Sequence, residues 1–273
     1  MPRSKAIVAL AVAMLVAAPA FAPALATPAP SAPQRVVSMN LCTDQLAMML
    51  AAPGQLISVS DLAQDKRMSP MAQEAAGYPI NRGRAEEIYL MNPDLVIAGE
   101  YASAPTVAML RRLGIRVEVL SPAEDIDAIR DQITQVGDLL GQPEKARQIL
   151  ADFDTGLARV TSKTGRGRAA LYYANGFTSG RDTLAGIIVT TAGYDNIAND
   201  YGVTETRALP LELLVMSDPD RLITGAKWPG QSRSEAILDH PVLAEITPNI
   251  IEATDANWVC GTPFILHAIR SLQ

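Results

Sequence analysis

Two segments of the chain repeat one pattern, and this repeat restricts the possible folds more than any other feature of the sequence. EEIYLMNPDLVIAG covers residues 86–99, and ELLVMSDPDRLITG covers residues 212–225. In each copy a Glu is followed seven positions later by Pro-Asp, and then by a short apolar run that ends in Gly. The apolar runs are typical of buried parallel strands, each entered from the helix that holds the Glu. The repeat therefore predicts two similar units.

The sequence around the first copy alternates predicted strands with predicted helices. Short strands are expected at Arg35 to Met39 and Leu56 to Ser60, on either side of a helix that contains Asp44 to Leu50. A further helix at Thr106 to Leu113 precedes a strand at Ile115 to Leu120. Strand-helix-strand units of this kind predict an α/β fold with mainly parallel sheets and helices on their faces.

A long helical stretch separates the two halves. We expect Ser121 to start a first helix that runs to about Leu140 and is broken at Gly141, and Pro143 to start a second helix that continues to about Ser162. A helix of about 20 residues is about 30 Å long, which is enough to bridge two units. The predicted organisation is an N-terminal lobe at residues 35–141, a linking helix at 142–163 and a C-terminal lobe at 164–273.

The first residues have the layout of a secretory signal peptide. Two basic residues precede an apolar run from Ala6 to Ala18, and small residues lead to a cleavage site after Ala26. A membrane anchor needs about 20 apolar residues, and this run is shorter and is interrupted at Pro19. We expect a signal peptide at residues 1–26 and a flexible leader at 27–34. A lipoprotein would have Cys at the cleavage point, so we expect a soluble exported protein.

Composition excludes several classes of function. The net charge is −6 and the chain has no basic runs, which is unlike a protein that binds nucleic acid or an anionic membrane. Two His residues exclude a site with three or more imidazoles. The sequence contains neither a G-x-x-x-x-G-K phosphate loop nor a G-x-S-x-G nucleophile elbow. We therefore predict a binding protein with no catalytic residues, no bound metal and no cofactor.

Several motifs occur in one order along nearly the whole chain. They are the strand RVVSM, the two Pro-Asp segments, the long helix, FTSG at Phe177 to Gly180 and AGYDNI at Ala192 to Ile197. This order resembles the helix-linked, class III periplasmic binding proteins of ABC importers for cobalamin, ferric siderophores and haem. The resemblance implies two lobes joined by one rigid helix, with the ligand in the cleft between them. It also implies a periplasmic monomer that captures a metal chelate, cobalamin or a ferric siderophore.

The resemblance gives the Glu of each repeat a role. In the family an acidic residue on each lobe pairs with Arg on the membrane subunits of the transporter, and the matching positions here are Glu86 and Glu212. The alternative is that each Glu is a solvated residue at a helix N-terminus, where the helix dipole favours acids. Glu87 is a possible substitute for Glu86. Their matched positions in the two copies favour docking.

Candidate ligand residues come from the carboxyl ends of the predicted strands, where doubly wound sheets bind ligands. Aromatic side chains suit a flat macrocycle because they bury a large area at small entropic cost, although most aromatic residues serve only in packing. Trp258 stands where the cobalamin-binding relatives place an aromatic residue against their ligand. The ligand-binding candidates are Asn40, Leu41, Cys42, Tyr101, Phe177, Trp228, Trp258 and Cys260.

A haem-binding member of the same family is an alternative. The haem-binding relatives use a Tyr in a G-Y-x-R stretch as an iron ligand, and this chain has Gly77 and Tyr78 followed by Arg82. The spacing from Tyr78 to Glu86 differs from the family pattern by one residue or more. The sequence therefore argues against haem ligation by Tyr78.

Cys42 and Cys260 are the only cysteines of the chain. In an exported protein such a pair indicates a disulfide, which requires Cα atoms within about 7 Å and here would have to cross the cleft. Two free thiols that hold a soft metal centre, or two inert cysteines, are the alternatives. A different class of function, an exported thiol or redox protein, would use the same residues. Against it, the pair is not C-x-x-C and neither Cys has a His nearby in sequence.

Overall fold

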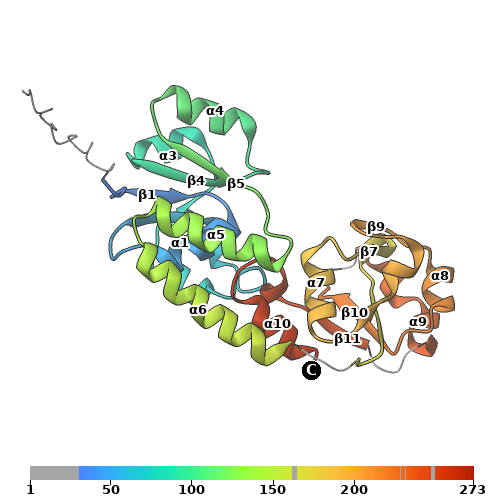
Figure 1. Ribbon diagram of the computed structural model, residues 1–273. Coiled ribbons are helices and arrows are strands. Elements are labelled where there is room, and N and C mark those ends of the chain that lie inside the picture. Colours follow the sequence, from blue (N-terminus) through green and yellow to red (C-terminus); the bar gives the residue numbers. More distant parts are fainter. Residues whose placement is uncertain (1–30, 162–164, 228, 231, 247–249) are drawn as a thin grey trace, which may run out of the picture. The chain divides into compact units, whose positions relative to one another are not determined.

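The first lobe is built around a parallel sheet with the strand order β3-β2-β1-β4-β5 (Figure 1). The computed structural model describes residues 31–161, 165–227, 229–230, 232–246 and 250–273, so the predicted signal peptide and Trp228 lie outside the described residues. Every residue of the interior strand β4 is buried, which explains its continuous apolar run because both faces of the sheet are covered. The strands are β1 (Val36–Ser38), β2 (Leu56–Ser60), β3 (Ile80–Asn81), β4 (Leu95–Gly99) and β5 (Val117–Leu120).

Helices cover both faces of this sheet. Leu95 and Ile97 of β4 belong to the hydrophobic core that includes α1 (Leu41–Leu50) and α5 (Ile126–Leu139). Their neighbours Val96 and Ala98 belong to a second core with α3 (Ala85–Leu90) and α4 (Ala104–Arg112). This alternation is the period of two that a strand imposes on its side chains. A short helix, α2 (Ala72–Ala75), precedes β3.

The predicted start of α5 at Ser121 is wrong. The helix begins at Ile126, after Asp125, whose carboxylate accepts a hydrogen bond from the amide of Ala128 at 2.7 Å. Residues 121–124 stay outside the helix, and buried Ala123 lies against Gly261, where an added Cβ would be 2.2 Å from the Ala123 oxygen. A tertiary contact therefore prevails over the local Ser-Pro signal.

Helix α6 (Pro143–Val160) joins the two lobes. It packs closely on α5 at Gly137. A Cβ at that position would lie only 2.4 Å from the Cβ of Ala146, so the contact requires Gly. Farther toward its C-terminal end α6 meets the last helix, where a Cβ on Gly156 would be 2.5 Å from Leu266. One core cluster includes residues of α5, α6 and both sheets. Residues 32–273 therefore form one compact unit.

The second lobe repeats the parallel design with the strand order β11-β10-β6-β8. These strands are β6 (Arg168–Leu171), β8 (Asp195–Asn196), β10 (Arg221–Gly225) and β11 (Ile250–Thr254), and a separate antiparallel pair is formed by β7 (Phe177–Ser179) and β9 (Thr206–Ala208). Its helices are α7 (Leu184–Thr191), α8 (Leu211–Met216), α9 (Pro241–Ile246) and α10 (Ile265–Ser271). The prediction of an α/β fold with mainly parallel sheets is confirmed.

Short 3-10 helices connect several of these elements. They are η1 (Asp61–Gln64), η2 (Ala174–Gly176), η3 (Ile197–Tyr201), η4 (Ala236–Asp239) and η5 (Ala256–Trp258). In the described part of the chain, no helix combines the length and the apolar character needed to cross a membrane.

Candidate ligand and docking sites

The two copies of the repeat fold into the same local structure. The Glu lies in the first turn of a six-residue helix, α3 in the first lobe and α8 in the second. The third residue of the repeat is fully buried in both copies, as Ile88 and Leu214. The helix is followed by Asn92 or Asp218 with positive φ, and the Pro-Asp step then leads into β4 or β10.

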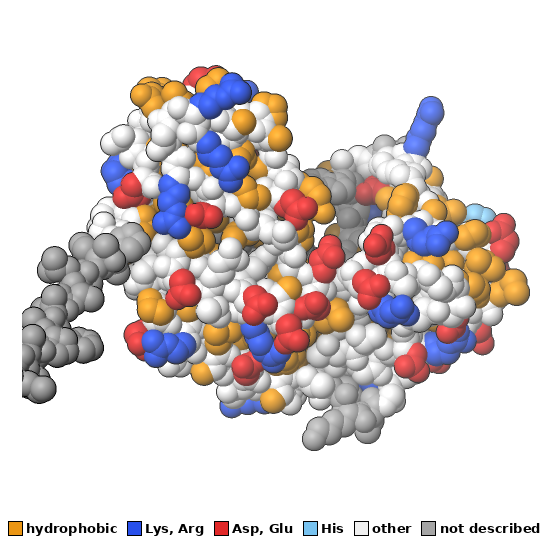
Figure 2. Space-filling model, turned by 45° about the horizontal axis from the view of Figure 1, so that its top comes forward, with side chains coloured by type: hydrophobic (Ala, Val, Ile, Leu, Met, Phe, Trp, Pro, Cys, Tyr) orange, Lys and Arg blue, Asp and Glu red, His pale blue; other side chains and the backbone are white. Residues whose placement is uncertain are grey.

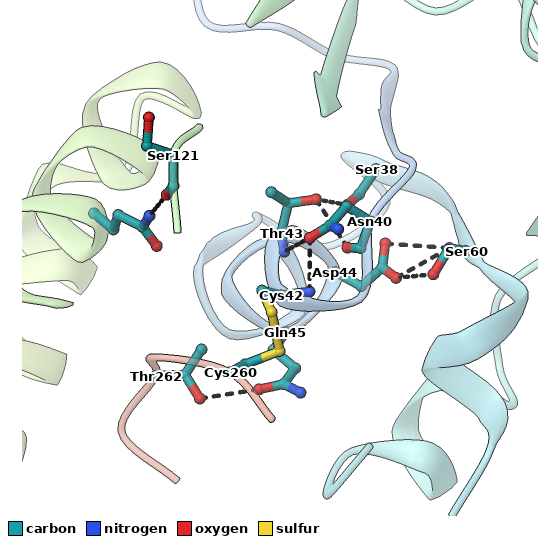
Figure 3. The surroundings of a disulfide bond; sticks show 11 residues. Ser38, Asn40, Cys42, Thr43, Asp44, Gln45, Ser60, Ser121, Cys260 and Thr262 are labelled. Atoms are coloured by element: carbon teal, nitrogen blue, oxygen red, sulfur yellow. Dashed lines mark hydrogen bonds between the residues drawn. A yellow bond between two sulfur atoms is a disulfide. The ribbon is translucent and has the colours of Figure 1, made fainter. Parts of the chain in front are cut away.

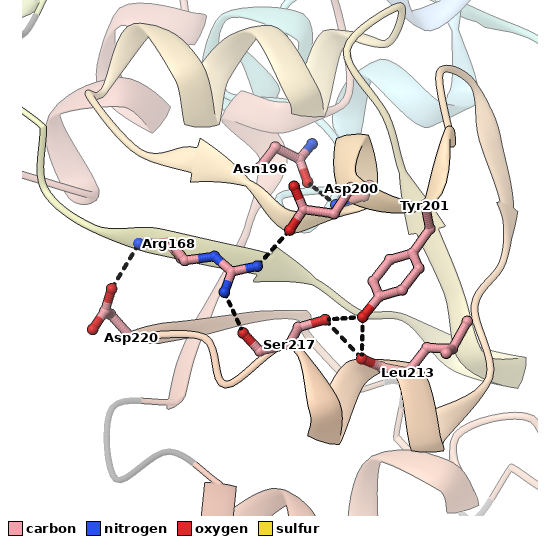
Figure 4. Close-up of polar contacts among 8 residues, drawn as sticks. Arg168, Asn196, Asp200, Tyr201, Leu213, Ser217 and Asp220 are labelled. Atoms are coloured by element: carbon pink, nitrogen blue, oxygen red, sulfur yellow. Dashed lines mark hydrogen bonds and ion pairs between the residues drawn. The ribbon is translucent and has the colours of Figure 1, made fainter.

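Each copy is attached to the neighbouring strand by an Arg and an Asp. In the second lobe, the Arg168 guanidinium donates to the carbonyl oxygen of Ser217, just after α8, at 2.7 Å. The Asp220 carboxylate accepts from the amide of Arg168, also at 2.7 Å (Figure 4). The same guanidinium forms an ion pair with Asp200 and thereby ties η3 to α8.

The first lobe repeats this attachment. The Arg35 guanidinium donates to the carbonyl oxygens of Met91 at 2.6 Å and Asn92 at 2.9 Å. The Asp94 carboxylate accepts from the amide of Arg35 at 2.9 Å and from that of Gln34 at 2.6 Å. We call these attachments the Arg-Asp clamps, Arg35 with Asp94 and Arg168 with Asp220. They fix each Glu helix to its sheet in the same way.

Glu86 and Glu212 are both exposed, and neither forms an ion pair or hydrogen bond with the described residues. Glu87 differs, because its carboxylate accepts a hydrogen bond from the amide of Arg82 at 2.9 Å. Glu86 is therefore the carboxylate of α3 that stays available to a partner.

Two adjoining pockets lie at the carboxyl ends of β6, β10 and β11. Their volumes are about 420 and about 690 Å³, and they share Arg67, Ala226, Thr254 and Asp255. Arg67 and Met68 come from the first lobe, and the second lobe contributes the ends of its strands. Volumes of this size are within the range of small-molecule sites. The pockets therefore define a candidate ligand cleft between the lobes.

Two aromatic residues, Tyr173 and Trp258, line the smaller of these pockets. Trp258 is the last residue of η5, the short helix after β11, and only 7% of its surface is exposed. Its indole Nε1 is buried and has no hydrogen-bond partner among the described residues. Burial raises the pKa of the Tyr173 hydroxyl, although a hydrogen bond with Ser179 acts in the opposite direction. The pocket is therefore lined by an indole ring, whose N–H group is shielded from solvent, and by a neutral phenol.

Charged side chains also line the smaller pocket. Arg67 makes a bidentate contact with Asp65, with Nε to Oδ1 at 3.1 Å and Nη2 to Oδ2 at 2.6 Å. The Arg67 side chain lowers the pKa of Asp65 to about 2 through these hydrogen bonds. Lys227 forms an ion pair with Asp239, and Asp255 accepts from the Asn257 amide at 2.9 Å. The polar groups of the wall are therefore held by local contacts.

A third pocket, of about 270 Å³, lies at the carboxyl ends of β1, β4 and β5. Asn40, Cys42 and Tyr101 line it, and Leu184 and Val259 come from beyond the linking helix. Asn40 also caps α1, because its Oδ1 accepts from the amides of Cys42 at 3.0 Å and Thr43 at 3.4 Å. Tyr101 is 84% exposed.

Cys42 and Cys260 form a disulfide, with Cα atoms 5.3 Å apart (Figure 3). The alternatives with two free thiols, which include soft metal ligation, are therefore wrong, and an exported thiol or redox protein is not favoured. Beside the bond, Thr262 Oγ1 donates to Gln45 Oε1 at 2.9 Å. The bond links α1 to the segment before α10, so that the segment returning from the second lobe is attached to the first.

A buried carboxylate, Asp44, lies on α1 near the disulfide (Figure 3). It accepts hydrogen bonds from the amide of Ser60 at 3.1 and 3.2 Å and from the Ser60 hydroxyl. Burial nevertheless raises the pKa of Asp44 to about 6, because the hydrogen bonds only partly replace the lost solvation.

The remaining candidates lie away from the described pockets. Leu41 is buried in the first lobe, and Phe177 is 40% exposed on β7. Tyr78 packs against the core and lines none of the described pockets. Among the described residues no group of three or more His, Cys, Asp or Glu could hold a metal. The sequence analysis missed Arg67, Met68, Lys227, Thr254 and Asp255.

Comparison with known proteins identifies the class. The family model described as periplasmic binding protein matches residues 36–249, so the chain belongs to this family, and the predicted resemblance is confirmed. Such substrate-binding proteins bind small molecules and work with ABC transporters.

Curated relatives include two cobalamin-binding proteins. The cobalamin-binding protein of Halobacterium salinarum is 28% identical over 237 residues, which cover 85% of this chain and 62% of the relative. The vitamin B12-binding protein of Salmonella choleraesuis is 25% identical over 214 residues, with 76% and 70% covered. The chain thus spans less than two thirds of the Halobacterium protein.

Solved structures show the same fold. The periplasmic heme-binding protein from Roseiflexus sp. RS-1 in apo form has a TM-score of 0.71 at 23% identity, with 88% of this chain and 96% of that chain covered. The periplasmic vitamin B12-binding protein of Vibrio cholerae has a TM-score of 0.60 at 19% identity, with 88% and 95% covered.

Proposed function

We propose that this protein binds a corrinoid of the cobalamin type in the cleft between its lobes and delivers it to the membrane subunits of an ABC importer. It acts as a periplasmic monomer and catalyses no reaction. The observation that carries this proposal is the pocket between the lobes, in which Tyr173 and the buried indole of Trp258 stand beside polar side chains. The names of the curated relatives in Halobacterium and Salmonella support the same ligand.

The chemistry of the pocket fits a macrocycle with polar substituents. A corrin offers a broad apolar face, which aromatic side chains cover well. Its amide side chains accept hydrogen bonds, and Arg67 and Lys227 in the pocket wall carry several N–H donors each.

Haem and a ferric siderophore are the competing ligands of the same cleft. Tyr78, the residue that the haem-binding relatives would suggest as an iron ligand, packs on the core and lines none of the described pockets. This placement favours a corrinoid. An exported redox protein is not favoured, because Cys42 and Cys260 are joined.

The ligand proposal is tested by calorimetry on protein purified from the periplasm. Cyanocobalamin, haem and ferrichrome are titrated in turn, and each is also tested by thermal unfolding. We expect saturable binding of cyanocobalamin and a higher melting temperature, because ligand at 100 times Kd adds about 2.7 kcal/mol to the free energy of unfolding. Saturable binding of haem or ferrichrome without binding of cyanocobalamin would assign the cleft to that ligand instead.

Docking is proposed to use Glu86 and Glu212. Both carboxylates are exposed, and in each lobe an Arg of the Arg-Asp clamps binds the carbonyl oxygen just after the Glu helix. A charge-assisted Arg-carboxylate pair fixes direction as well as contributing attraction. Uptake is measured with inner-membrane vesicles prepared from the native host after deletion of this gene. Purified protein is added to the vesicles. Replacing both residues by Ala should reduce uptake and leave cyanocobalamin affinity unchanged, with each single change milder.

The matched control for docking is Glu87→Ala, since Glu87 is already bound to the amide of Arg82. It should keep full uptake. Salt should weaken docking of the wild type, because exposed pairs are screened over roughly 10 Å at ordinary ionic strength. Undiminished uptake by the double variant would remove the docking role, and lost cyanocobalamin binding would instead place these residues in the ligand site.

Export is proposed to remove residues 1–26 and to leave a protein without a lipid anchor. N-terminal sequencing of the periplasmic protein should therefore begin at Thr27. Full-length chain in the cytoplasm, or a lipid-modified form in the membrane fraction, would contradict this localisation.

A further inference from the structure

Each docking helix carries an exposed apolar side chain one turn after its Glu. Leu90 follows Glu86 by four residues and Met216 follows Glu212 by four, within α3 and α8. Side chains four residues apart lie on the same face of a helix. Leu90 is 82% exposed and Met216 is 76% exposed, and among the large apolar side chains described only Tyr101 is more exposed.

The two exposed residues are a matched pair. A single exposed Leu is ordinary on a protein surface. Here the exposure occurs at the same position of both repeats, two residues after positions that are fully buried in both lobes, Ile88 and Leu214. Packing of the helices on their sheets therefore accounts for the apolar side chains of Ile88 and Leu214. It does not account for those of Leu90 and Met216, which are exposed. Figure 2 shows hydrophobic side chains at the surface of both lobes, near acidic ones.

The clamps hold these side chains in place. The residue after Leu90 is Met91, whose carbonyl oxygen accepts from Arg35 at 2.6 Å. The residue after Met216 is Ser217, whose carbonyl oxygen accepts from Arg168 at 2.7 Å. The exposed side chains thus stand on backbone that is already fixed, and a partner that covers them has little conformational entropy to remove.

We propose that the docking surface consists of two Glu-apolar pairs, Glu86 with Leu90 and Glu212 with Met216. Each pair meets one of two related membrane subunits of the importer, which offers a cationic side chain to the carboxylate and an apolar patch to Leu90 or Met216. This inference rests on the proposed docking to an ABC importer. The partner must have two equivalent sites, because the chain presents the same pair on two similar lobes.

The apolar residues supply what the carboxylates cannot. An exposed ion pair contributes little to affinity because water solvates both charges. An apolar contact beside the pair removes apolar surface from water and also excludes water from the charges. In this arrangement the carboxylates set the orientation and the salt dependence of docking, while Leu90 and Met216 set much of its strength.

The test measures how tightly fluorescently labelled protein from the periplasm binds inner-membrane vesicles of the native host that lacks the gene, at several salt concentrations. The double variant Leu90→Gln with Met216→Gln should bind at least tenfold more weakly, with the salt dependence of the wild type. The double variant Glu86→Gln with Glu212→Gln should bind more weakly and lose most of the salt dependence. Both variants should keep the wild-type melting temperature, since the changed side chains are exposed.

Two controls keep the apolar effect specific. The exchange Leu90→Met with Met216→Leu preserves apolar surface and should bind as the wild type does. Leu62→Gln changes an apolar residue that is 47% exposed outside the two helices and should also be neutral.

Wild-type affinity in the Leu90→Gln, Met216→Gln variant would overturn the inference, and so would the absence of saturable binding by the wild type. If cyanocobalamin binding fails but the vesicle measurements give the expected losses, the ligand proposal falls and the docking surface stands.

Discussion

Asn92 and Asp218 occupy the same place in the two repeats, and both have a left-handed backbone, with φ of 48° and 45°. Asn and Asp adopt this conformation more readily than other residues with a side chain. The turn directs carbonyl groups at the end of each Glu helix toward the Arg at the start of the neighbouring strand, Arg35 just before β1 or Arg168 as the first residue of β6. The conformation at these two residues is therefore part of both clamps.

The left-handed turn predicts a specific ranking of variants. Asn92→Ala should lower the free energy of unfolding by about 1 to 2 kcal/mol, because a Cβ without a local polar group disfavours this conformation. Asn92→Gly should be close to the wild type, since Gly adopts positive φ readily. The same ranking is expected at Asp218. Urea unfolding at constant pH measures it, and equal stability of the Ala and Gly variants would contradict the role of backbone conformation.

The disulfide should contribute to stability through the long segment that it closes. Cys42 and Cys260 are separated by 218 positions, and removing a native disulfide typically costs about 2 to 5 kcal/mol. We expect the double variant Cys42→Ser with Cys260→Ser to lose stability in this range. Reductant should lower the stability of the wild type similarly and leave the double variant unchanged. If reductant lowered the stability of both proteins equally, its effect would not come from reduction of the Cys42–Cys260 bond.

Asp44 should make stability depend on pH in the acidic range. Its pKa is raised from 3.8 to about 6 in the folded protein, so the folded state holds this proton more tightly than the unfolded chain. Its contribution is complete below about pH 4 and is lost as pH rises through about 6. Two pKa units correspond to about 3 kcal/mol. The stability of wild type relative to Asp44→Asn should therefore fall by roughly that amount between pH 4 and pH 7.

The control for this pH effect is Asp131→Asn, a change at an exposed acid on α5. Relative to wild type it should show no comparable trend. Chemical unfolding at half-unit pH steps gives both comparisons. If the stability difference between wild type and Asp44→Asn stayed constant from pH 4 to pH 7, Asp44 would have an ordinary pKa.

Much of the fold could be predicted because its local signals are strong. β2 occupies Leu56–Ser60 as expected. Its apolar stretch follows turn residues, and the last three residues of the strand are buried. α6 starts at Pro143, a residue that fits the first turn of a helix. The repeat predicts two similar lobes from the sequence alone. These features depend on short stretches of chain.

The unpredicted features depend on contacts between distant segments. Arg67 and Met68 reach the pocket from the irregular stretch after η1, where no periodic pattern exists. The sequence does not decide whether the two cysteines form a disulfide. The bond requires the segment after η5 to return to the first lobe, where Gly261 packs on Ala123. Lys227 and Asp255 could have been found, because they lie within two residues of the ends of β10 and β11, at the edge where ligands bind.

Trp258 should distinguish a ligand contact from simple packing. It lines the pocket between the lobes, and its buried Nε1 has no partner in the described structure. Trp258→Ala should weaken cyanocobalamin binding by about 1 to 3 kcal/mol, the range for a buried aromatic contact at a binding site. Trp258→Phe should fall between this variant and the wild type, because it keeps an apolar ring but one of smaller area. Calorimetry well below the melting temperature separates affinity from any loss of stability.

Phe177→Ala is the matched control for Trp258, since Phe177 is partly exposed on β7 and lines none of the described pockets. It should bind cyanocobalamin with wild-type affinity. The chain has two Trp residues, so Trp258→Phe also shows how much of any fluorescence quenching on binding comes from Trp258. Quenching that persists in full in Trp258→Phe, together with wild-type affinity in Trp258→Ala, would reduce Trp258 to a core residue. A loss of affinity in Trp258→Ala but not in Phe177→Ala would instead place the ligand against the indole.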